Sequence, residues 1–296
     1  MGDFRSGFVA IVGRANVGKS TLLNTIIGQK VTIVSDKPQT TRNRIQCVWT
    51  TDESQVVFLD TPGFHRPQDR LGEAMMEAAQ EAIAEVDAVL FLVDGPSGAG
   101  RGDRIVAEKL AKATTPVLLV VNKLDAVPRE ERDGIVDSFR ALGSFASVHG
   151  ISALTGEGVP ELCREIQDLL PVGPKYYPDD WVSDHPERFV VAELVREKVL
   201  HLTREEVPHA TAVEVERMER EEGRDLVHID ATIYVERESQ KGIVIGKRGA
   251  LLKEVGTLAR QDIERLLGSP VFLQLWVKVR RDWRDRESAL RELGYK

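Results

Sequence analysis

Residues Gly13 to Ser20 have the sequence GRANVGKS, which follows an apolar run and precedes a helical pattern. This is the G-x-x-x-x-G-K-[ST] pattern of a loop that binds phosphates. Backbone N–H groups at the start of the helix can coordinate phosphate oxygens. Lys19 is then placed to reach the β- and γ-phosphates, and the Ser20 hydroxyl to bind Mg²⁺. The pattern predicts a site for a nucleoside triphosphate.

A second segment, DTPG from Asp60 to Gly63, ends another apolar run. The Asp60 carboxylate can hold the Mg²⁺ shell through a water molecule, and the N–H of Gly63 can reach the γ-phosphate. These residues predict the metal end of the same site.

Two further segments specify the base. In NKLD, Asn122 to Asp125, the Asp125 carboxylate can accept from N1–H and the exocyclic amine of guanine. Adenine presents no such donors and would leave a buried acceptor unpaired, at a cost of about 1–3 kcal/mol. SAL, Ser152 to Leu154, can offer the Ala153 N–H to the guanine oxygen. An ATPase is excluded unless Asp125 faces away, and the chain resembles the translation-factor class of GTPases.

The predicted nucleotide contacts extend over all four segments. They are Gly13, Arg14, Ala15, Asn16, Val17, Gly18, Lys19, Ser20, Thr21, Asp60, Thr61, Pro62, Gly63, Asn122, Lys123, Asp125, Ser152, Ala153 and Leu154.

The polar segment KPQTTRNR, Lys37 to Arg44, resembles the first switch of this class. There, one threonine binds Mg²⁺ only when the γ-phosphate is present. Alignment with the Pro-x-x-Thr pattern assigns this role to Thr41, with Thr40 as the alternative. Catalysis is assigned to Lys19, Thr41, Gly63 and Asn16, and the expected Mg²⁺ ligands are Ser20, Thr41 and, through water, Asp60.

The residue after Gly63 is Phe64, where many small GTPases have a glutamine that orients the attacking water. A phenyl ring cannot orient water, so slow intrinsic hydrolysis is expected. His65 is a candidate base or a solvent-facing switch residue. The substitution resembles GTPases in which an asparagine at the position of Asn16 helps to bind K⁺, so K⁺ stimulation is expected.

A second glycine turn, Gly246-Lys247-Arg248-Gly249, precedes an apolar helical pattern. It resembles the G-x-x-G loop of a KH domain, which closes on the backbone of about four unpaired nucleotides. The expected RNA contacts are Ile243, Ile245, Gly246, Lys247, Arg248 and Gly249. Trp276 and Trp283 are further candidates for stacking on bases, although the alternation around Trp276 predicts a core position. Lys278, Arg280 and Arg281 are either phosphate contacts or simply exposed.

The periodicity predicts two domains and a linker. Apolar strands alternate with helices over residues 1–171, which predicts an α/β P-loop domain with a mostly parallel sheet and helices on both faces. Residues 172–188 are proline-rich and predict a linker. Residues 189–296 predict a small α+β domain, a type II KH fold with its extra elements at the N-terminal side.

Charge is unevenly distributed along the 296 residues. The net charge is −7, yet residues 239–296 contain 13 basic and 7 acidic side chains. Such a cationic segment in an acidic chain is a candidate footprint for a polyanion. The two cysteines are distant in sequence, as suits a reducing cytoplasm, and the sequence predicts neither a secretory signal nor a membrane span.

One GTPase domain is followed by one KH domain, and the chain contains GRANVGKSTLLN, PQTTRNR, DTPG, NKLD, SQKGIVIGKRG and DWR in this order. This arrangement resembles the Era-like bacterial GTPases over the whole chain. The resemblance implies binding near the 3′ end of 16S rRNA, a role in maturing the 30S subunit, and peripheral association with the inner face of the cell membrane. A monomer is expected. The alternative is a regulatory GTPase whose C-terminal domain docks protein or membrane instead of RNA.

Overall fold

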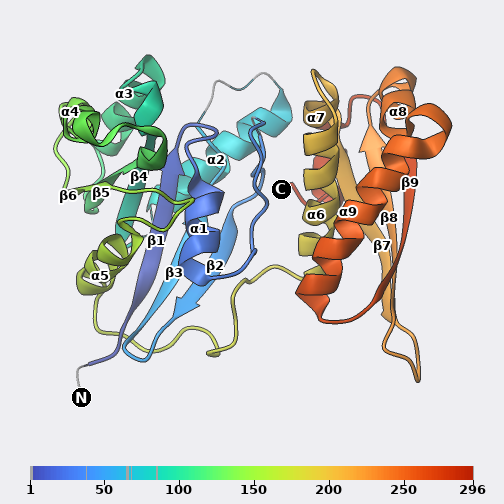
Figure 1. The fold of residues 1–296 in the computed structure, drawn as a ribbon, viewed down its shortest axis with the longest axis horizontal. Helices are drawn as coiled ribbons and strands as arrows, with labels where there is room; N and C mark the ends of the chain where they lie inside the picture. Colours follow the sequence, from blue (N-terminus) through green and yellow to red (C-terminus); the bar gives the residue numbers. More distant parts are fainter. Residues whose placement is uncertain (1–2, 38, 65–66, 68, 85, 296) are drawn as a thin grey trace. The chain divides into compact units, whose positions relative to one another are not determined.

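The computed structural model describes residues 3–295 except 38, 65, 66, 68 and 85. Two compact units are present (Figure 1). The N-terminal unit comprises Met1–Thr32, Thr41–Pro67 and Gly72–Asp184, and the C-terminal unit comprises Ile33–Thr40, Gln68–Leu71 and His185–Lys296. The domain bounds expected from sequence, with a separate linker at 172–188, stay a prediction.

The N-terminal unit contains a six-stranded sheet in the order β2-β3-β1-β4-β5-β6, in which only the edge strand β2 is antiparallel. The strands are β1 (Arg5–Gly13), β2 (Ile45–Thr50), β3 (Ser54–Asp60), β4 (Ala88–Asp94), β5 (Val117–Asn122) and β6 (Ser147–Gly150). The helices are α1 (Lys19–Ile27), α2 (Arg70–Ala84), α3 (Arg101–Leu110), α4 (Arg132–Arg140) and α5 (Val159–Leu169).

Helices cover both faces of this sheet, and its central strands are therefore apolar on both sides. All residues of β4 from Ala88 to Val93 are buried, as are all six of β5. One face packs in a core with residues of α2, α3 and α4, and α1 and α5 lie on the other, toward the viewer in Figure 1. Parallel strands with this covering place their carboxyl ends, and the loops that follow, at one edge of the sheet.

The C-terminal unit has a three-stranded sheet in the order β7-β8-β9, with β7 antiparallel and β9 parallel to β8. Its strands are β7 (Ala212–Arg220), β8 (Val227–Val235) and β9 (Val271–Val279), and its helices are α6 (Glu187–Leu202), α7 (Val207–Ala210), α8 (Glu238–Ile245), α9 (Ala250–Leu267) and α10 (Glu287–Glu292). Alternate residues of β8 are buried in a core shared with α6 and α9. This is the α+β KH arrangement expected from sequence.

Helix α8 was not predicted. The sequence GIVI within it favours an extended strand, because glycine and β-branched residues disfavour helix. The start of the helix is capped by Gln240, whose Oε1 accepts from the N–H groups of Glu236 and Arg237 at 2.9 and 3.0 Å. The buried Val244 then anchors the helix on the core. A capping box and tertiary packing thus override the local propensity. Within the described residues, no helix is long and apolar enough to cross a membrane.

Candidate GTP and RNA sites

The loop between β1 and α1 requires glycine at its last position. Gly18 has φ +100°, and a Cβ atom there would lie 2.2 Å from Nδ2 of Asn122. That amide donates to the Val17 carbonyl at 2.8 Å. A side chain from the carboxyl end of β5 therefore fixes the end of the loop. Its last residue has a conformation that only glycine adopts without strain.

Lys19 is buried at the first position of α1. Its Nζ donates to the carbonyl of Arg14 at 2.9 Å, so the ammonium lies over the loop. Burial lowers the pKa of Lys19 to about 8, and the Asp60 carboxylate opposes this shift. The side chain is thus a cation held beside the predicted phosphate site.

Three oxygen-bearing side chains converge at the carboxyl end of β3. Ser20 Oγ lies 3.1 Å from Asp60 Oδ2 and 3.2 Å from Thr41 Oγ1, and Thr41 Oγ1 lies 3.3 Å from Asp60 Oδ2. Burial raises the pKa of Asp60 to about 6, while Lys19 and the hydrogen bonds from Ser20 and Thr41 lower it. Asp60 Oδ1 is buried and has no hydrogen-bond partner among the described residues. Hard oxygen ligands with an unpaired carboxylate oxygen fit Mg²⁺.

The neighbouring threonine is oriented differently. Thr40 Oγ1 donates to the carbonyl of Lys37 at 2.6 Å and lies 3.4 Å from the carbonyl of Ser35. Its hydroxyl is therefore used within its own loop, whereas Thr41 faces the hydroxyl of Ser20. The structure distinguishes the two threonines that the sequence left open as alternatives.

The segments predicted to bind the base are tied together by side chains at the carboxyl ends of β5 and β6. Asn122 Oδ1 accepts from the N–H of Ala153 at 2.8 Å. Ser152 Oγ donates to Asp125 Oδ1 at 2.6 Å. Lys123 Nζ donates to the carbonyl of Asn16 at 2.7 Å and pairs with Asp94 at 3.0 Å. The four predicted nucleotide segments thus form one continuous site.

Two carboxylates of this site were not found from sequence. Asp103, at the start of α3, is buried and pairs with Arg14 at 3.1 Å. Asp94, at the end of β4, pairs with Lys123. Asp94 is the last residue of β4, as Asp60 is of β3, and this position was the available signal; Asp103 lies within α3 and had none.

Phe64 lies beside the predicted phosphate-binding loop and brings no polar side-chain group to it. Its N–H donates to the carbonyl of Gly13 at 3.0 Å, and Nζ of Lys109 lies 5.1 Å from the centre of its ring. His65 lies outside the described residues. Its proposed roles stay predictions.

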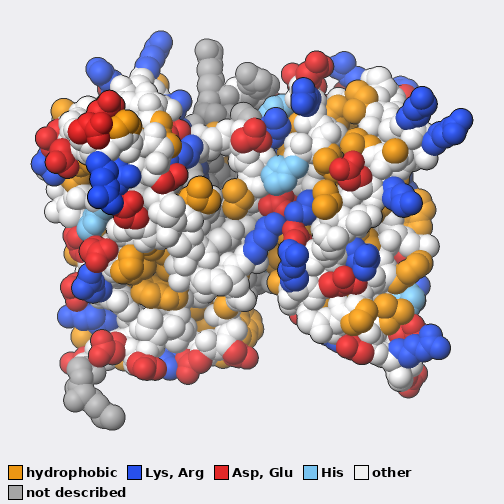
Figure 2. Space-filling view, in the orientation of Figure 1, with side chains coloured by type: hydrophobic (Ala, Val, Ile, Leu, Met, Phe, Trp, Pro, Cys, Tyr) orange, Lys and Arg blue, Asp and Glu red, His pale blue; other side chains and the backbone are white. Residues whose placement is uncertain are grey.

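The turn from Gly246 to Gly249 connects α8 to α9. Gly246 has φ +72°, and a Cβ atom there would lie 2.8 Å from Cβ of Leu251. Arg248 itself has φ +54°. Lys247 and Arg248 are exposed, and neither forms an ion pair with any described residue. Figure 2 shows basic side chains gathered over α8 and the beginning of α9. The turn therefore presents two free cations to solvent.

A groove of about 420 Å³ adjoins this turn, between α9 and β9. It is lined by Gly249, Leu252, Lys253, Gly256, Thr257, Arg260, Leu273 and Leu275. Sequence reasoning identified only Gly249 of this set by number, and it expected apolar contacts from Ile243, Val244 and Ile245 or from neighbouring strand residues. Ile243 is half exposed on α8 and is not part of the wall. The period-two alternation of β9, which points Leu273 and Leu275 to one face, was the signal that could have found the wall.

Of the two tryptophans considered as stacking residues, one is exposed and the other is buried. Trp276 is 42% exposed, so its predicted core position was wrong. It lies on the face of the sheet that α6 and α9 do not cover. Alternation along a strand separates its two faces but does not say which face is buried. Trp283 is fully buried, and its Nε1–H donates to the carbonyl of Ala210 at 2.9 Å. It therefore cannot stack on a base.

Two of the three basic residues considered at the end of β9 pair with carboxylates, and Arg281 is exposed. Lys278 pairs with Glu216 at 2.9 Å, and Arg280 pairs with Glu292. Arg284, which sequence reasoning assigned no role, pairs with Glu236 at 2.7 Å and with Asp69 at 3.1 Å. Asp69 belongs to the segment Gln68–Leu71, which is part of the C-terminal unit. Asp69 and Arg70 are therefore held by the DWR sequence and the aspartate that follows it, since the N–H of Arg70 also donates to Asp285.

The fold and the two sites define a P-loop GTPase followed by a KH domain. Residues 8–123 match the family model described as 50S ribosome-binding GTPase, and residues 206–284 match the KH domain model.

The chain belongs to the GTPase Era family. It is 54% identical over 292 residues to GTPase Era of Alkaliphilus oremlandii, with 99% of each chain covered. It is also similar to the crystal structure of Era in complex with MgGDPNP and nucleotides 1506–1542 of 16S ribosomal RNA, at 41% identity, a TM-score of 0.95 and 99% coverage of both chains. A variant of Aquifex aeolicus Era bound to GDP·AlF₄⁻ matches with the same identity, coverage and TM-score.

Proposed function

We propose that this GTPase binds the single-stranded 3′ end of 16S rRNA through its KH domain and assists maturation of the 30S ribosomal subunit. The carrying observation is the Gly246–Gly249 turn, which presents two unpaired cations beside a groove with apolar walls. Glycines permit close approach to a sugar–phosphate backbone, and an apolar wall accepts unstacked bases. A relative that matches over 99% of the chain has been solved with that part of 16S rRNA.

The nucleotide site is proposed to use the residues predicted from sequence. Lys19 and the loop amides bind the phosphates, and Ser20 and Thr41 bind Mg²⁺ directly, with Asp60 acting through water. Asp125 recognises guanine, and the N–H of Ala153 would bind the guanine oxygen in exchange for its hydrogen bond to Asn122 Oδ1. The support is geometric: the hydroxyls and the carboxylate lie within 3.3 Å of one another. A relative holds MgGDPNP.

K⁺ is proposed as a second cation at Asn16. The reason is chemical, because Phe64 has no group that could orient water or neutralise charge that develops on the phosphates. Asn16 is the loop residue with φ +66°, and its carbonyl already accepts from Lys123.

Nucleotide binding is proposed to be coupled to RNA binding. GTP would order residues 37–44 and the segment after Gly63, and this ordering would change access to the groove. Equal RNA affinity with GDP and with a non-hydrolysable GTP analogue would contradict the coupling.

The protein is further proposed to act as a monomer in the cytoplasm, with peripheral association at the inner face of the cell membrane. Sedimentation of the purified chain with and without vesicles of bacterial lipids would test both statements.

The RNA target is tested by crosslinking the full-length protein to total cellular RNA and sequencing the bound fragments. We expect enrichment at the 3′ end of 16S rRNA. Fragments spread evenly over cellular RNA would contradict the proposal, and so would the absence of crosslinked RNA, which would favour the alternative of a protein- or membrane-docking domain.

A further inference from the structure

Helix α6 contacts a segment that lies about 160 positions earlier in the chain. The segment Ile33–Thr40 belongs to the same compact unit as α6. Glu193, Arg196, Glu197 and His201 occupy positions i, i+3, i+4 and i+8 and therefore lie along one side of the helix. The last three of these contact the segment directly.

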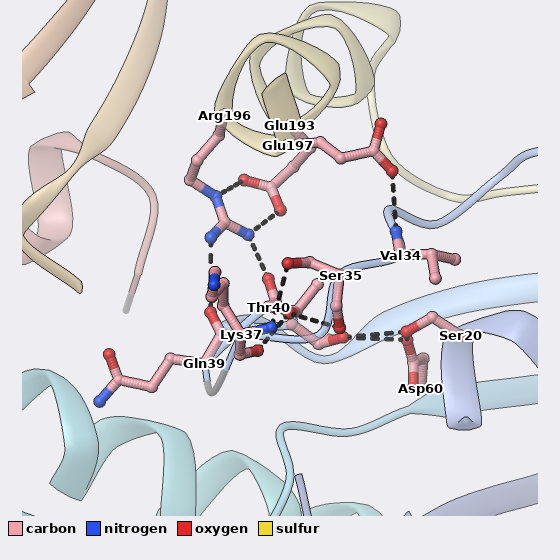
Figure 3. A network of polar contacts seen from close by, with 11 residues as sticks. Ser20, Val34, Ser35, Lys37, Gln39, Thr40, Asp60, Glu193, Arg196 and Glu197 are labelled. Carbon is pink, nitrogen blue, oxygen red and sulfur yellow. Dashed lines mark hydrogen bonds and ion pairs between the residues drawn. The ribbon is translucent and has the colours of Figure 1, made fainter. Parts of the chain in front are cut away.

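Arg196 is the centre of this contact. Its side chain is fully buried, and its Nε donates to Glu193 Oε1 at 2.7 Å while Nη2 donates to Glu193 Oε2. Nη2 also donates to the carbonyl of Thr40, and Nη1 lies 3.4 Å from the carbonyl of Gln39 (Figure 3). The planar guanidinium thus binds a carboxylate on one side and main-chain carbonyls on the other, which the single ammonium of a lysine cannot reproduce.

The charge of this buried group is maintained by its partner. Burial lowers the pKa of Arg196, but the Glu193 carboxylate and its hydrogen bonds more than compensate, so that the pKa lies above its ordinary value. A buried ion pair of this kind needs all its donors satisfied, since an unpaired buried charge is costly. The carbonyls of residues 39 and 40 accept further hydrogen bonds, from Nη1 and Nη2.

The other end of the segment is fixed to the same helix. Glu197 Oε1 accepts from the N–H of Val34 at 2.9 Å, and His201 Nε2 lies 2.9 Å from the Val34 carbonyl. Ile33 is buried in the core of the C-terminal unit. Residues 33–40 are therefore held at both ends by the unit that contains the RNA groove.

The residue after Thr40 belongs to the nucleotide site. Thr41 is part of the N-terminal unit, and its hydroxyl contacts Ser20 and Asp60. The carbonyl bound by Arg196 therefore belongs to the peptide bond that joins Thr40 to Thr41. Consecutive Cα atoms are about 3.8 Å apart across a rigid planar peptide, so a displacement of the Thr40 carbonyl is passed to Thr41.

We propose that Arg196 is a positioning residue for Thr41, through which the C-terminal unit stabilises the Mg²⁺·GTP form of the nucleotide site. Mg²⁺ requires ligands at about 2.0–2.1 Å in near-octahedral geometry, so it is sensitive to the placement of this threonine. The coupling is reciprocal, because a contact that favours the GTP form is itself favoured when GTP is bound. The inference rests on the proposed role of Thr41 as a Mg²⁺ ligand.

The test compares Mg²⁺ dependence in two nucleotide forms of the full-length protein. A fluorescent non-hydrolysable GTP analogue and a fluorescent GDP are each titrated with Mg²⁺. Arg196→Lys keeps a charge for Glu193 but loses the donors to the carbonyls. For Arg196→Lys we expect the Mg²⁺ concentration for half-maximal binding of the GTP analogue to rise about tenfold, within the range typical of coupling between sites. Binding of GDP, which does not use Thr41, should change less than about twofold on the same ground.

A second variant guards against misfolding. Glu193→Met combined with Arg196→Met removes both buried charges and conserves apolar volume, a replacement that buried ion pairs usually tolerate. It should show the same selective shift. Arg188→Lys is the matched control, because Arg188 is exposed on the same helix and contacts Met218 instead of the segment.

Comparison with Thr41→Ala distinguishes the role of Arg196 from the role of Thr41 as a Mg²⁺ ligand. If GDP and the GTP analogue weaken equally in the Arg196 variants, the pair is purely structural and the proposal is wrong. If Thr41→Ala shifts the Mg²⁺ requirement and neither Arg196 variant does, the proposal is also wrong while the metal site stands. If Thr41→Ala itself has no effect, the proposed metal site fails first and the inference fails with it.

Discussion

The hydroxyl of Ser152 donates a hydrogen bond to the carboxylate of Asp125 at 2.6 Å. The bond leaves the second carboxylate oxygen of an exposed aspartate available as an acceptor, and it fixes the direction in which that oxygen points. An acceptor oxygen held in a fixed direction suits the adjacent N–H donors on the edge of guanine. If Asp125 selects the base as proposed, that selection depends on one side chain oriented by a neighbouring loop.

Replacement of Asp125 by asparagine should change the preferred base. An amide donates where the carboxylate accepted, and xanthine presents a carbonyl in place of the guanine amine. Affinity for GTP should fall by about 10–100-fold, corresponding to a lost hydrogen bond to a charged group, and affinity for XTP should rise. Competition binding with both nucleotides measures this. Asp133→Asn, an exposed aspartate of α4, should leave the preference unchanged, and unaltered GTP affinity in Asp125→Asn would show that another residue selects the base.

The two threonines before β2 should differ in function. Thr41→Ala removes a hydroxyl beside Ser20 and Asp60, so the GTP analogue should bind about tenfold more weakly at limiting Mg²⁺, as expected for loss of one interaction with a charged partner. Thr40→Ala removes hydrogen bonds to the carbonyls of Lys37 and Ser35 within its own loop and should have a much smaller effect. Calorimetry at several Mg²⁺ concentrations distinguishes them. A larger loss in Thr40→Ala would reverse the assignment.

Much of the nucleotide site could be predicted from sequence, because its residues occupy fixed positions next to strands. Each motif follows an apolar run, and parallel strands bring their carboxyl ends together without reference to the rest of the chain. The carboxylates Asp94 and Asp103 were missed because a single acidic residue forms no sequence motif. They stabilise the loops by pairing with Lys123 and Arg14.

The C-terminal unit was less predictable, since its decisive contacts are distant in sequence. The helical state of residues 238–245 depends on the side chain of Gln240 and on packing of Val244. Arg196 and Arg284 appeared as ordinary helix and loop residues. Only the fold brings them to residues 39–40 and to Asp69.

Reversal of charge in the glycine turn should abolish RNA binding selectively. Lys247→Glu combined with Arg248→Glu places carboxylates where phosphates would lie, so affinity for a single-stranded 16S 3′-end oligonucleotide should fall by an order of magnitude or more. Loss of two phosphate contacts should also reduce the slope of log affinity against log salt by about 1.4. Filter binding over a salt series measures both.

The control for this change lies in the same unit. Arg220→Glu with Arg224→Glu makes the same change in net charge at the β7–β8 turn, at the other end of the sheet (Figure 1). It should leave RNA affinity nearly unaltered. GTP hydrolysis in the absence of RNA should be normal in both variants. If the turn variant bound RNA normally, the C-terminal unit would have to dock something other than RNA at this loop.

Trp283 should matter for stability and not for RNA. Trp283→Phe leaves the buried carbonyl of Ala210 without its donor and leaves a gap beside Tyr295. We expect a loss of about 2–4 kcal/mol in the free energy of unfolding, from the unpaired acceptor and the cavity together. Trp276→Phe, at an exposed position, should change it by less than about 0.5 kcal/mol. Urea titration measures both, and equal effects would contradict the burial of Trp283.

Potassium should accelerate hydrolysis of GTP if Asn16 helps to hold a monovalent cation. Phe64 cannot supply the polar group that orients water in many GTPases, so a cation near the phosphates is the available means of balancing the charge that develops in the transition state. Phosphate release is measured in KCl and in NaCl at equal ionic strength, and the rate in KCl should be higher. Asn16→Ala should remove that difference while Mg²⁺-dependent GDP binding persists. Lys123→Ala tests the alternative that the loop conformation is responsible, because Lys123 Nζ holds the Asn16 carbonyl without contributing a ligand for K⁺. Equal rates in the two salts for the unaltered protein would exclude the potassium site.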